Sequence, residues 1–174
     1  MTASLIISMI ALTVTMANLT WQLALYLLNG PRLQVRMTVG AIGAGGMVTM
    51  PVENVRNLDE TFRSFAQQGY SQPVLAVEVV NLGRLGVELL DFGVDVSKGA
   101  SLKPLKDAVT ETPMPYVLEP HRQGTWAIPF EYVVRLNEAS RAAWPNEPHP
   151  IRAFVHRAGG KKVHAKQTLS LDLR

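Results

Sequence analysis

The sequence predicts a mainly β protein, in which a transmembrane helix over residues 1–30 precedes an immunoglobulin-like antiparallel β-sandwich over residues 31–174. The first charged residue is Arg32, so all 17 Lys and Arg and all 14 Asp and Glu residues lie in residues 32–174, where they make up about 22% of the chain. Seven or so short apolar segments then follow at sandwich-like spacing, without strand–helix–strand alternation. The absence of Cys and of a second long apolar segment excludes a disulfide scaffold and a multi-span transporter.

The uncharged segment is long enough to cross a membrane as a helix. Leu5 to Leu28 is 24 residues, about 36 Å of helix, against a hydrocarbon core of roughly 30 Å. Trp21 and Tyr26 lie toward one end, where aromatic rings favour the headgroup level, and residues 29–31 (Asn-Gly-Pro) end the helix. A cleaved signal peptide would need a basic start and a small-x-small cleavage site, and neither is present. We therefore expect a retained membrane helix.

A polar seam runs along this helix. Its members are small or polar and are spaced 4, 3, 4, 3 and 4 residues apart: Ser4, Ser8, Ala11, Thr15, Asn18 and Gln22. Small residues allow close helix approach in lipid, and amides can hydrogen-bond across helices. One interpretation is self-association into a homo-oligomer, or docking on a partner helix, through this seam. In the other, the hydroxyls bond to their own helix and Gln22 reaches the interface.

The basic residues that flank the helix predict its orientation. Arg32 and Arg36 follow the helix, whereas residues 1–4 carry no basic side chain. Together with Trp21 and Tyr26, these two arginines form the expected membrane-interface set. The positive-inside rule then places the soluble domain in the cytoplasm of a single-pass protein of the cell membrane.

Alternation and glycine content predict the first elements of the domain. Leu33–Val39 alternates apolar and polar residues, as in a half-buried strand. Gly40–Gly46 is expected to be a flexible loop, because no P-loop lysine follows its glycines. Met47–Pro51 predicts a short strand, and the apolar spacing within Asn57–Gln68 predicts a short helix.

The later elements follow from the same signals. Asn81–Arg84 predicts a turn between two strands, and Ser97–Pro115 a long connection with at most one short strand. Phe130–Ala143 predicts only a short helix before Pro145. The further strands are expected over Pro73–Asn81, Val87–Val96, Thr125–Ile128, Ile151–Val155 and Lys162–Leu173.

The last two strands predict a hairpin whose register can be argued. A three-residue loop over Ala158–Gly160 pairs Val155 with Val163, and this keeps one face apolar. The other face then carries Arg152, Phe154, His156, Lys162, His164 and Lys166. These residues form either a basic patch for anionic lipid or nucleic acid, or a solvated outer face with lysines that discourage aggregation. The net charge of only +3 favours the second interpretation and disfavours nucleic acid as a partner.

No residue pattern predicts catalysis. The four histidines lack metal-ligand spacing, and without Cys there is no thiol nucleophile. Alternation places Asp91 and Asp95 on one face and Glu88 on the other, which we interpret as surface charge rather than an acid–base or Ca²⁺ site. We expect neither an enzyme nor a metal or cofactor.

Several motifs resemble small uncharacterised bacterial proteins, often actinobacterial or carried by phages of such bacteria. The motifs are Trp21-Gln22 with Tyr26, Asn29-Gly30-Pro31-Arg32-Leu33-x-Val35, Val77-x-Val79-x-Asn81-x-Gly83-Arg84-x-x-Val87, Leu118-Glu119-Pro120 and Trp126-x-Ile128-Pro129. The resemblance implies a single-pass helix with a cytoplasmic immunoglobulin-like sandwich. It implies no activity and no site residues.

These inferences predict a membrane-anchored, non-enzymatic interaction module with a protein partner that the sequence does not identify. A structural assembly subunit, such as a virion or envelope component whose helix packs in a protein bundle, is the alternative. A third interpretation, a small-ligand or hydrolytic domain, would use Asp91, Asp95 or His121.

Overall fold

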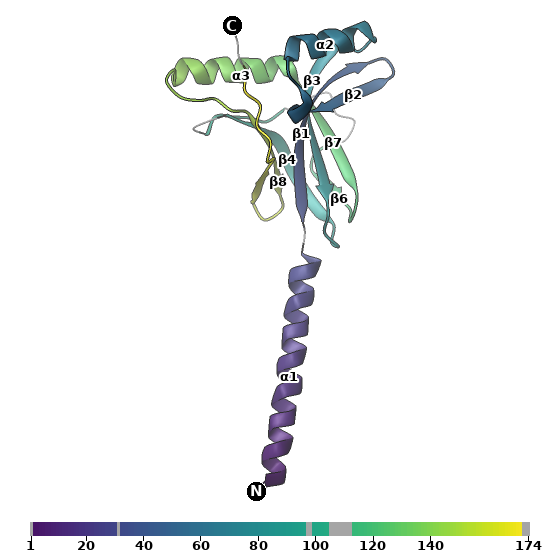
Figure 1. Ribbon diagram of the computed structural model, residues 1–174, viewed down its shortest axis with the longest axis vertical. Coiled ribbons are helices and arrows are strands. Elements are labelled where there is room, and N and C mark those ends of the chain that lie inside the picture. Colours follow the sequence, from purple (N-terminus) through teal and green to yellow (C-terminus); the bar gives the residue numbers. More distant parts are fainter. Residues whose placement is uncertain (1, 31, 97–98, 105–112, 172–174) are drawn as a thin grey trace.

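The N-terminal helix stands clear of the rest of the protein. In the computed structural model, which describes the chain except residues 1, 31, 97–98, 105–112 and 172–174 and the side chains of residues 2 and 26–29, helix α1 spans Thr2–Asn29 (Figure 1). Residues 30–32 alone separate it from the first strand of the domain. The predicted order, an apolar helix followed by a β-sandwich, is confirmed.

Two antiparallel sheets form the domain. The first has the strand order β2-β1-β3-β7, and the second has the order β5-β4-β8-β9, with β6 also paired to β4. The strands of the first sheet are β1 (Leu33–Gly43), β2 (Gly46–Pro51), β3 (Gln72–Asn81) and β7 (Gln123–Pro129). The strands of the second are β4 (Val87–Asp95), β5 (Ser101–Leu102), β6 (Tyr116–Leu118), β8 (Arg152–Arg157) and β9 (Lys162–His164).

The core lies between the sheets and follows from strand alternation. Val35, Met37 and Val39 are buried along β1, as the period of two requires. Trp126 of β7 is fully buried, and its ring lies 6.0 Å from that of Phe92, between ring centroids. Because the inner faces of both sheets are apolar, each sheet covers the other and the core excludes water.

The predicted glycine loop is wrong over most of its length. Strand β1 continues to Gly43, β2 begins at Gly46, and the two pair up to that point. A Cβ on Gly40 would lie 2.3 Å from the carbonyl oxygen of Val48, and one on Gly43 would lie 2.5 Å from that of Gly69. These glycines therefore permit close backbone approach, of β2 to Gly40 and of the segment after α2 to Gly43, rather than flexibility.

Two further helices lie at the end of the sandwich far from α1 (Figure 1). Helix α2 (Leu58–Gln67) confirms its prediction, and the Asn57 side chain caps it by accepting from the N–H groups of Asp59 and Glu60. A short 3-10 helix, η1 (Val52–Asn54), precedes it. Helix α3 (Phe130–Ala143) has 14 residues and is longer than predicted. Its buried face, which includes Val133, stabilises helical turns that local sequence alone would not favour.

Candidate membrane and protein interface

The apolar surface of α1 is available for contact over the candidate span Ala3–Leu25. Its candidate membrane span, Ala3–Leu25, has 23 residues, about 34 Å of helix, and none of it is buried inside the protein. Leu12 and Val14, near the middle, are 62% and 63% exposed. Such a surface is unfavourable in water, and its length and composition make α1 a candidate membrane span.

The six seam residues share one narrow face of this helix. At 100° per residue their directions fall within about 80° of one another. The Ser8 hydroxyl donates to the Ser4 carbonyl and the Thr15 hydroxyl to that of Ala11, both at 2.8 Å. Gln22 Nε2 reaches Asn18 Oδ1 only at 3.5 Å, the long limit of a hydrogen bond. The hydroxyls of Ser8 and Thr15 are therefore satisfied within the helix, while the two amides are held weakly and stay accessible to another helix.

The expected membrane-interface residues lie at different distances along the chain from the end of α1. Trp21 is exposed near the end of α1, and Arg32 is exposed where the domain begins. Arg36 lies four residues further along β1, roughly 13 Å beyond Arg32, and its register partner is Glu78 of β3. Tyr26 belongs to α1, but its side chain lies outside the described residues. Arg32 is thus better placed than Arg36 to contact headgroups.

The hairpin of β8 and β9 has the predicted register. Val155 pairs with Val163, and the Ala165 N–H donates to the Ala153 carbonyl at 2.8 Å. The second arm is shorter than predicted, because β9 ends at His164 and only an isolated bridge, Ile151 with Leu169, continues the pairing.

The outer face of this hairpin meets two carboxylates of β4. We call Asp91, Asp95, Lys103, His156, Lys162 and His164 the charge cluster. Asp91 lies 2.6 Å from His156 Nδ1 and 2.7 Å from Lys103 Nζ, measured from its two carboxylate oxygens. Asp95 accepts from Lys162 Nζ at 2.8 and 2.9 Å and lies 2.8 Å from His164 Nε2. The predicted common face of Asp91 and Asp95 is confirmed.

These pairings change the interpretation of the predicted basic patch. Its members Lys162, His156 and His164 are engaged with carboxylates, while Arg152 and Lys166 are exposed at the margin. The surface therefore has mixed charge rather than a uniform positive charge. Sequence reasoning missed this because the acids and bases lie more than 60 residues apart along the chain and meet only when β4 pairs with β8.

An apolar side chain lies beneath the charge cluster. Phe154 is fully buried although it belongs to the outer face. Its register partner is Gly93, where a Cβ would lie 2.9 Å from the Phe154 ring, so the glycine leaves room for the phenyl group. Lys162 Nζ lies 3.8 Å from the ring centroid, which is cation–π distance. The cluster thus covers an apolar centre.

We expect Asp95→Asn to lower the free energy of unfolding by about 1–2 kcal/mol, because it leaves Lys162 without its charge partner over the Phe154 ring. The carboxylate is 19% exposed, so solvent screens part of the loss. Urea denaturation in detergent would measure the change. Glu131→Gln removes an exposed pair with Arg135 and is the matched control, expected to change stability by less than about 0.5 kcal/mol. Equal effects from both substitutions would contradict this role of Asp95.

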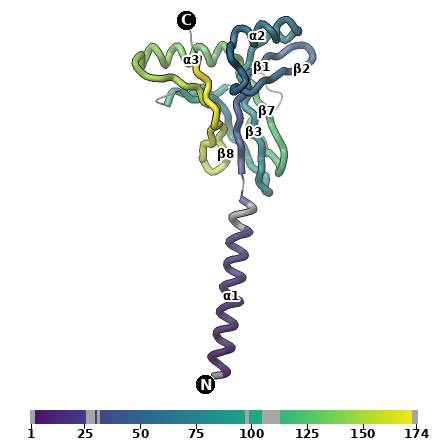
Figure 2. The backbone as a smooth tube through the Cα atoms, in the orientation of Figure 1, coloured from purple at the N-terminus to yellow at the C-terminus, as the bar shows by residue number. Residues whose placement is uncertain are grey.

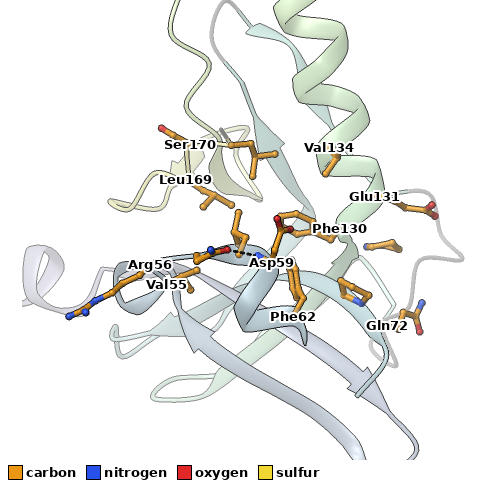
Figure 3. A pocket seen from close by; sticks show the side chains of 15 residues that line it. Val55, Arg56, Asp59, Phe62, Gln72, Phe130, Glu131, Val134, Leu169 and Ser170 are labelled. Carbon is orange, nitrogen blue, oxygen red and sulfur yellow. Dashed lines mark hydrogen bonds between the residues drawn. The ribbon is translucent and has the colours of Figure 1, made fainter. Parts of the chain in front are cut away.

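A cavity of about 790 Å³ opens at the end of the domain far from α1 (Figure 3). It lies between α2, α3 and residues 169–171, and Phe62 and Phe130 meet edge to face at 4.8 Å in its wall. Sequence reasoning did not predict it, since its walls come from three distant segments. Among the described residues, no group of three or more His, Asp or Glu is placed to hold a metal.

The residues of the hydrolytic interpretation do not meet. Asp91 and Asp95 contact His156 and His164, whereas His121 lies in the turn beside Asn81, to which its N–H donates at 2.9 Å. His121 is therefore not paired with Asp91 or Asp95, as a hydrolytic site built from these three residues would require.

Fold and surfaces together define the class: a long exposed apolar helix joined almost directly to a two-sheet β-sandwich. No protein-family model matches the chain, and no characterised protein or solved structure is significantly similar to it.

Proposed function

We propose that this protein is a single-pass, membrane-anchored interaction module, without catalytic activity, that presents a β-sandwich at the membrane surface. The observation that carries the proposal is the 23-residue apolar span of α1, none of which is buried in the protein. With residues 30–32 as the whole connection, the sandwich stays next to the bilayer. A protein partner and the lipid bilayer are the expected contacts.

The strand connectivity supports an immunoglobulin-like assignment of the sandwich. Strands β1, β3 and β7 pair in the order of strands A, B and E of that fold, and β4, β8 and β9 pair in the order of C, F and G. Strand A is an edge strand in that fold, so β2 is an added strand outside β1, and among the described residues no strand lies beyond β7 where strand D would be. Immunoglobulin-like sandwiches commonly present loops or sheet faces to partners, and this supports an interaction role by analogy alone.

The proposed orientation places the sandwich in the cytoplasm. Arg32 and Arg36 follow the span, and residues 1–4 have no basic side chain. Ala44 is exposed in the β1–β2 turn, far from α1, and the chain has no Cys, so Ala44→Cys introduces a unique thiol. We expect a membrane-impermeant maleimide to leave it unlabelled in intact cells and to label it after lysis. Labelling in intact cells would overturn the cytoplasmic orientation.

We further propose that the seam on α1 mediates helix association. Asn18→Leu/Gln22→Leu removes both amides while retaining an apolar helix, so we expect the crosslinked oligomer to fall by about fivefold to tenfold in membranes. Thr13→Val/Thr20→Val is the matched control, because both hydroxyls bond to their own helix. Unchanged crosslinking of the amide variant would exclude association through the seam.

Sedimentation and membrane fractionation distinguish the alternative function. A structural assembly subunit, such as a virion or envelope component, would use the seam and the rest of α1 inside a protein bundle. Its particle would sediment uniformly without detergent and would be free of lipid. Recovery of the chain in the membrane fraction after alkaline carbonate washing supports the anchored module instead.

A further inference from the structure

Three turns lie at the end of the sandwich that faces α1 (Figure 2). The Leu82 N–H donates to the carbonyl of Arg32 at 2.7 Å, so the β3–β4 turn is bonded to the residue that directly precedes β1. The Asn81 N–H donates to the Arg122 carbonyl at 3.0 Å, which places the turn over 119–122 beside it. The β8–β9 loop lies at the same end, because its Ala158 N–H donates to the carbonyl of Glu88, near the start of β4, at 2.8 Å.

The β3–β4 turn exposes apolar side chains at this end. Leu82 and Leu85 are 53% and 55% exposed, although the sandwich buries most of its other large apolar residues. Their backbone is fixed by the buried Asn81, whose amide donates to the Leu85 carbonyl at 2.8 Å and whose oxygen accepts from the Gly83 N–H at 3.0 Å. Two leucines held by a rigid turn beside the proposed membrane anchor would gain favourable burial if lipid covered them.

Exposed basic residues outnumber exposed acids in and beside the three turns. Arg32, Arg84, Arg122 and Lys161 are exposed in or beside the three turns, against the exposed acids Glu88 and Glu119. Exposed leucines at an end of the domain with an excess of basic residues match the interface of an anionic leaflet, where acyl chains begin below phosphate groups.

We propose that Leu82 and Leu85 insert into the interfacial layer of an anionic bilayer, while Arg84, Arg122 and Lys161 contact its phosphate headgroups. The inference rests on the proposed membrane anchoring, and it adds that the sandwich docks on the bilayer in one orientation. The outer face of the second sheet, with the charge cluster, then stands at the side of the docked domain and stays accessible.

The test uses the full chain in vesicles. Leu85→Cys carries an environment-sensitive fluorophore, and Ala44→Cys, roughly 35 Å further along the hairpin of β1, carries the same label as the control. With vesicles of one-third phosphatidylserine, we expect acyl-chain spin-labelled lipid to quench the label at 85 and not the label at 44. In vesicles of phosphatidylcholine alone, we expect quenching at 85 to be weaker.

Charge variants test the headgroup contacts. Arg84→Gln/Arg122→Gln in the Leu85→Cys background should lower the docked-to-undocked ratio by about fivefold for each arginine, and 0.5 M salt should act in the same direction. Lys166→Gln, an exposed basic residue beyond β9, is the matched control and should change nothing.

Flotation of the same samples separates the two proposals. If the chain fails to float with vesicles in high salt, membrane anchoring itself is wrong. If it floats but the label at 85 is quenched no more than the label at 44, the docking proposal alone is overturned. Quenching at 85 that neither salt nor the arginine variants alter would overturn the headgroup contacts.

Discussion

Val14→Arg is expected to reduce membrane integration of the chain by about 100-fold. Val14 lies near the middle of Ala3–Leu25 and is exposed, so the guanidinium would lie at the centre of the bilayer. On insertion scales an arginine there is unfavourable by about 3 kcal/mol relative to valine. This corresponds to a decrease of about 100-fold in the equilibrium constant for insertion. The measurement is the carbonate-resistant fraction of the chain in cell membranes.

Two controls accompany this prediction. Val14→Leu keeps the position apolar and should leave integration unchanged. Ala3→Arg places the same charge at the end of the span, where its side chain reaches the headgroups, and should cost far less. Retention of Val14→Arg in the membrane at the wild-type level would show that α1 is shielded from lipid by other helices.

Asn81→Leu is expected to lower the free energy of unfolding by about 3–4 kcal/mol, a large part of the 5–15 kcal/mol of an ordinary domain. Asn81 is fully buried, and its amide donates to the carbonyls of Leu118 and Glu119 at 3.0 and 3.2 Å in addition to that of Leu85. Leucine has a similar branched shape, although it is larger, and it leaves these carbonyls and the Gly83 N–H without the partner that Asn81 supplies. Urea unfolding in detergent, followed by tryptophan fluorescence, would measure the loss.

The control for this prediction lies in the neighbouring turn. Glu119→Gln alters an exposed side chain and should change stability by less than about 0.5 kcal/mol. A small effect of Asn81→Leu, within that range, would show that the turns hold their positions without this side chain. The proposed lipid docking predicts a second effect, since loosening the turn that carries Leu82 and Leu85 should also lower quenching at position 85.

Strand positions followed closely from local pattern. Alternation predicted β1, β3 and β4, and apolar complementarity alone selected the register of Val155 with Val163 in the last hairpin. These predictions succeeded because a period of two and a fixed loop length are properties of neighbouring residues. The errors were the Gly40–Gly46 loop, the length of α3 and the length of the last strand, which ends at His164. The first arose where a packing partner comes from elsewhere in the chain, the Gly69 carbonyl beside Gly43.

The candidate surfaces likewise differ in whether local sequence pattern predicts them. The seam on α1 could be identified from spacing, because a helix repeats every 3.6 residues. The charge cluster could not, because Asp95 and Lys162 are 67 residues apart and meet only after β4 and β8 pair. The exposure of Leu82 and Leu85 was equally invisible, since an apolar turn residue is buried or exposed according to which other turns surround it.

The sequence by itself determined that an uncharged helix precedes a β-sandwich, because charge distribution and periodicity act locally along the chain. The tertiary structure decided the environment of each charge and each exposed leucine. It paired Lys162 and His156 of the hairpin with carboxylates of β4, and it brought Leu82 beside Arg32 and Arg122 beside Asn81. The physical reason is that side-chain environment depends on which distant strands pair, and pairing is settled by burial of the whole core rather than by any one segment.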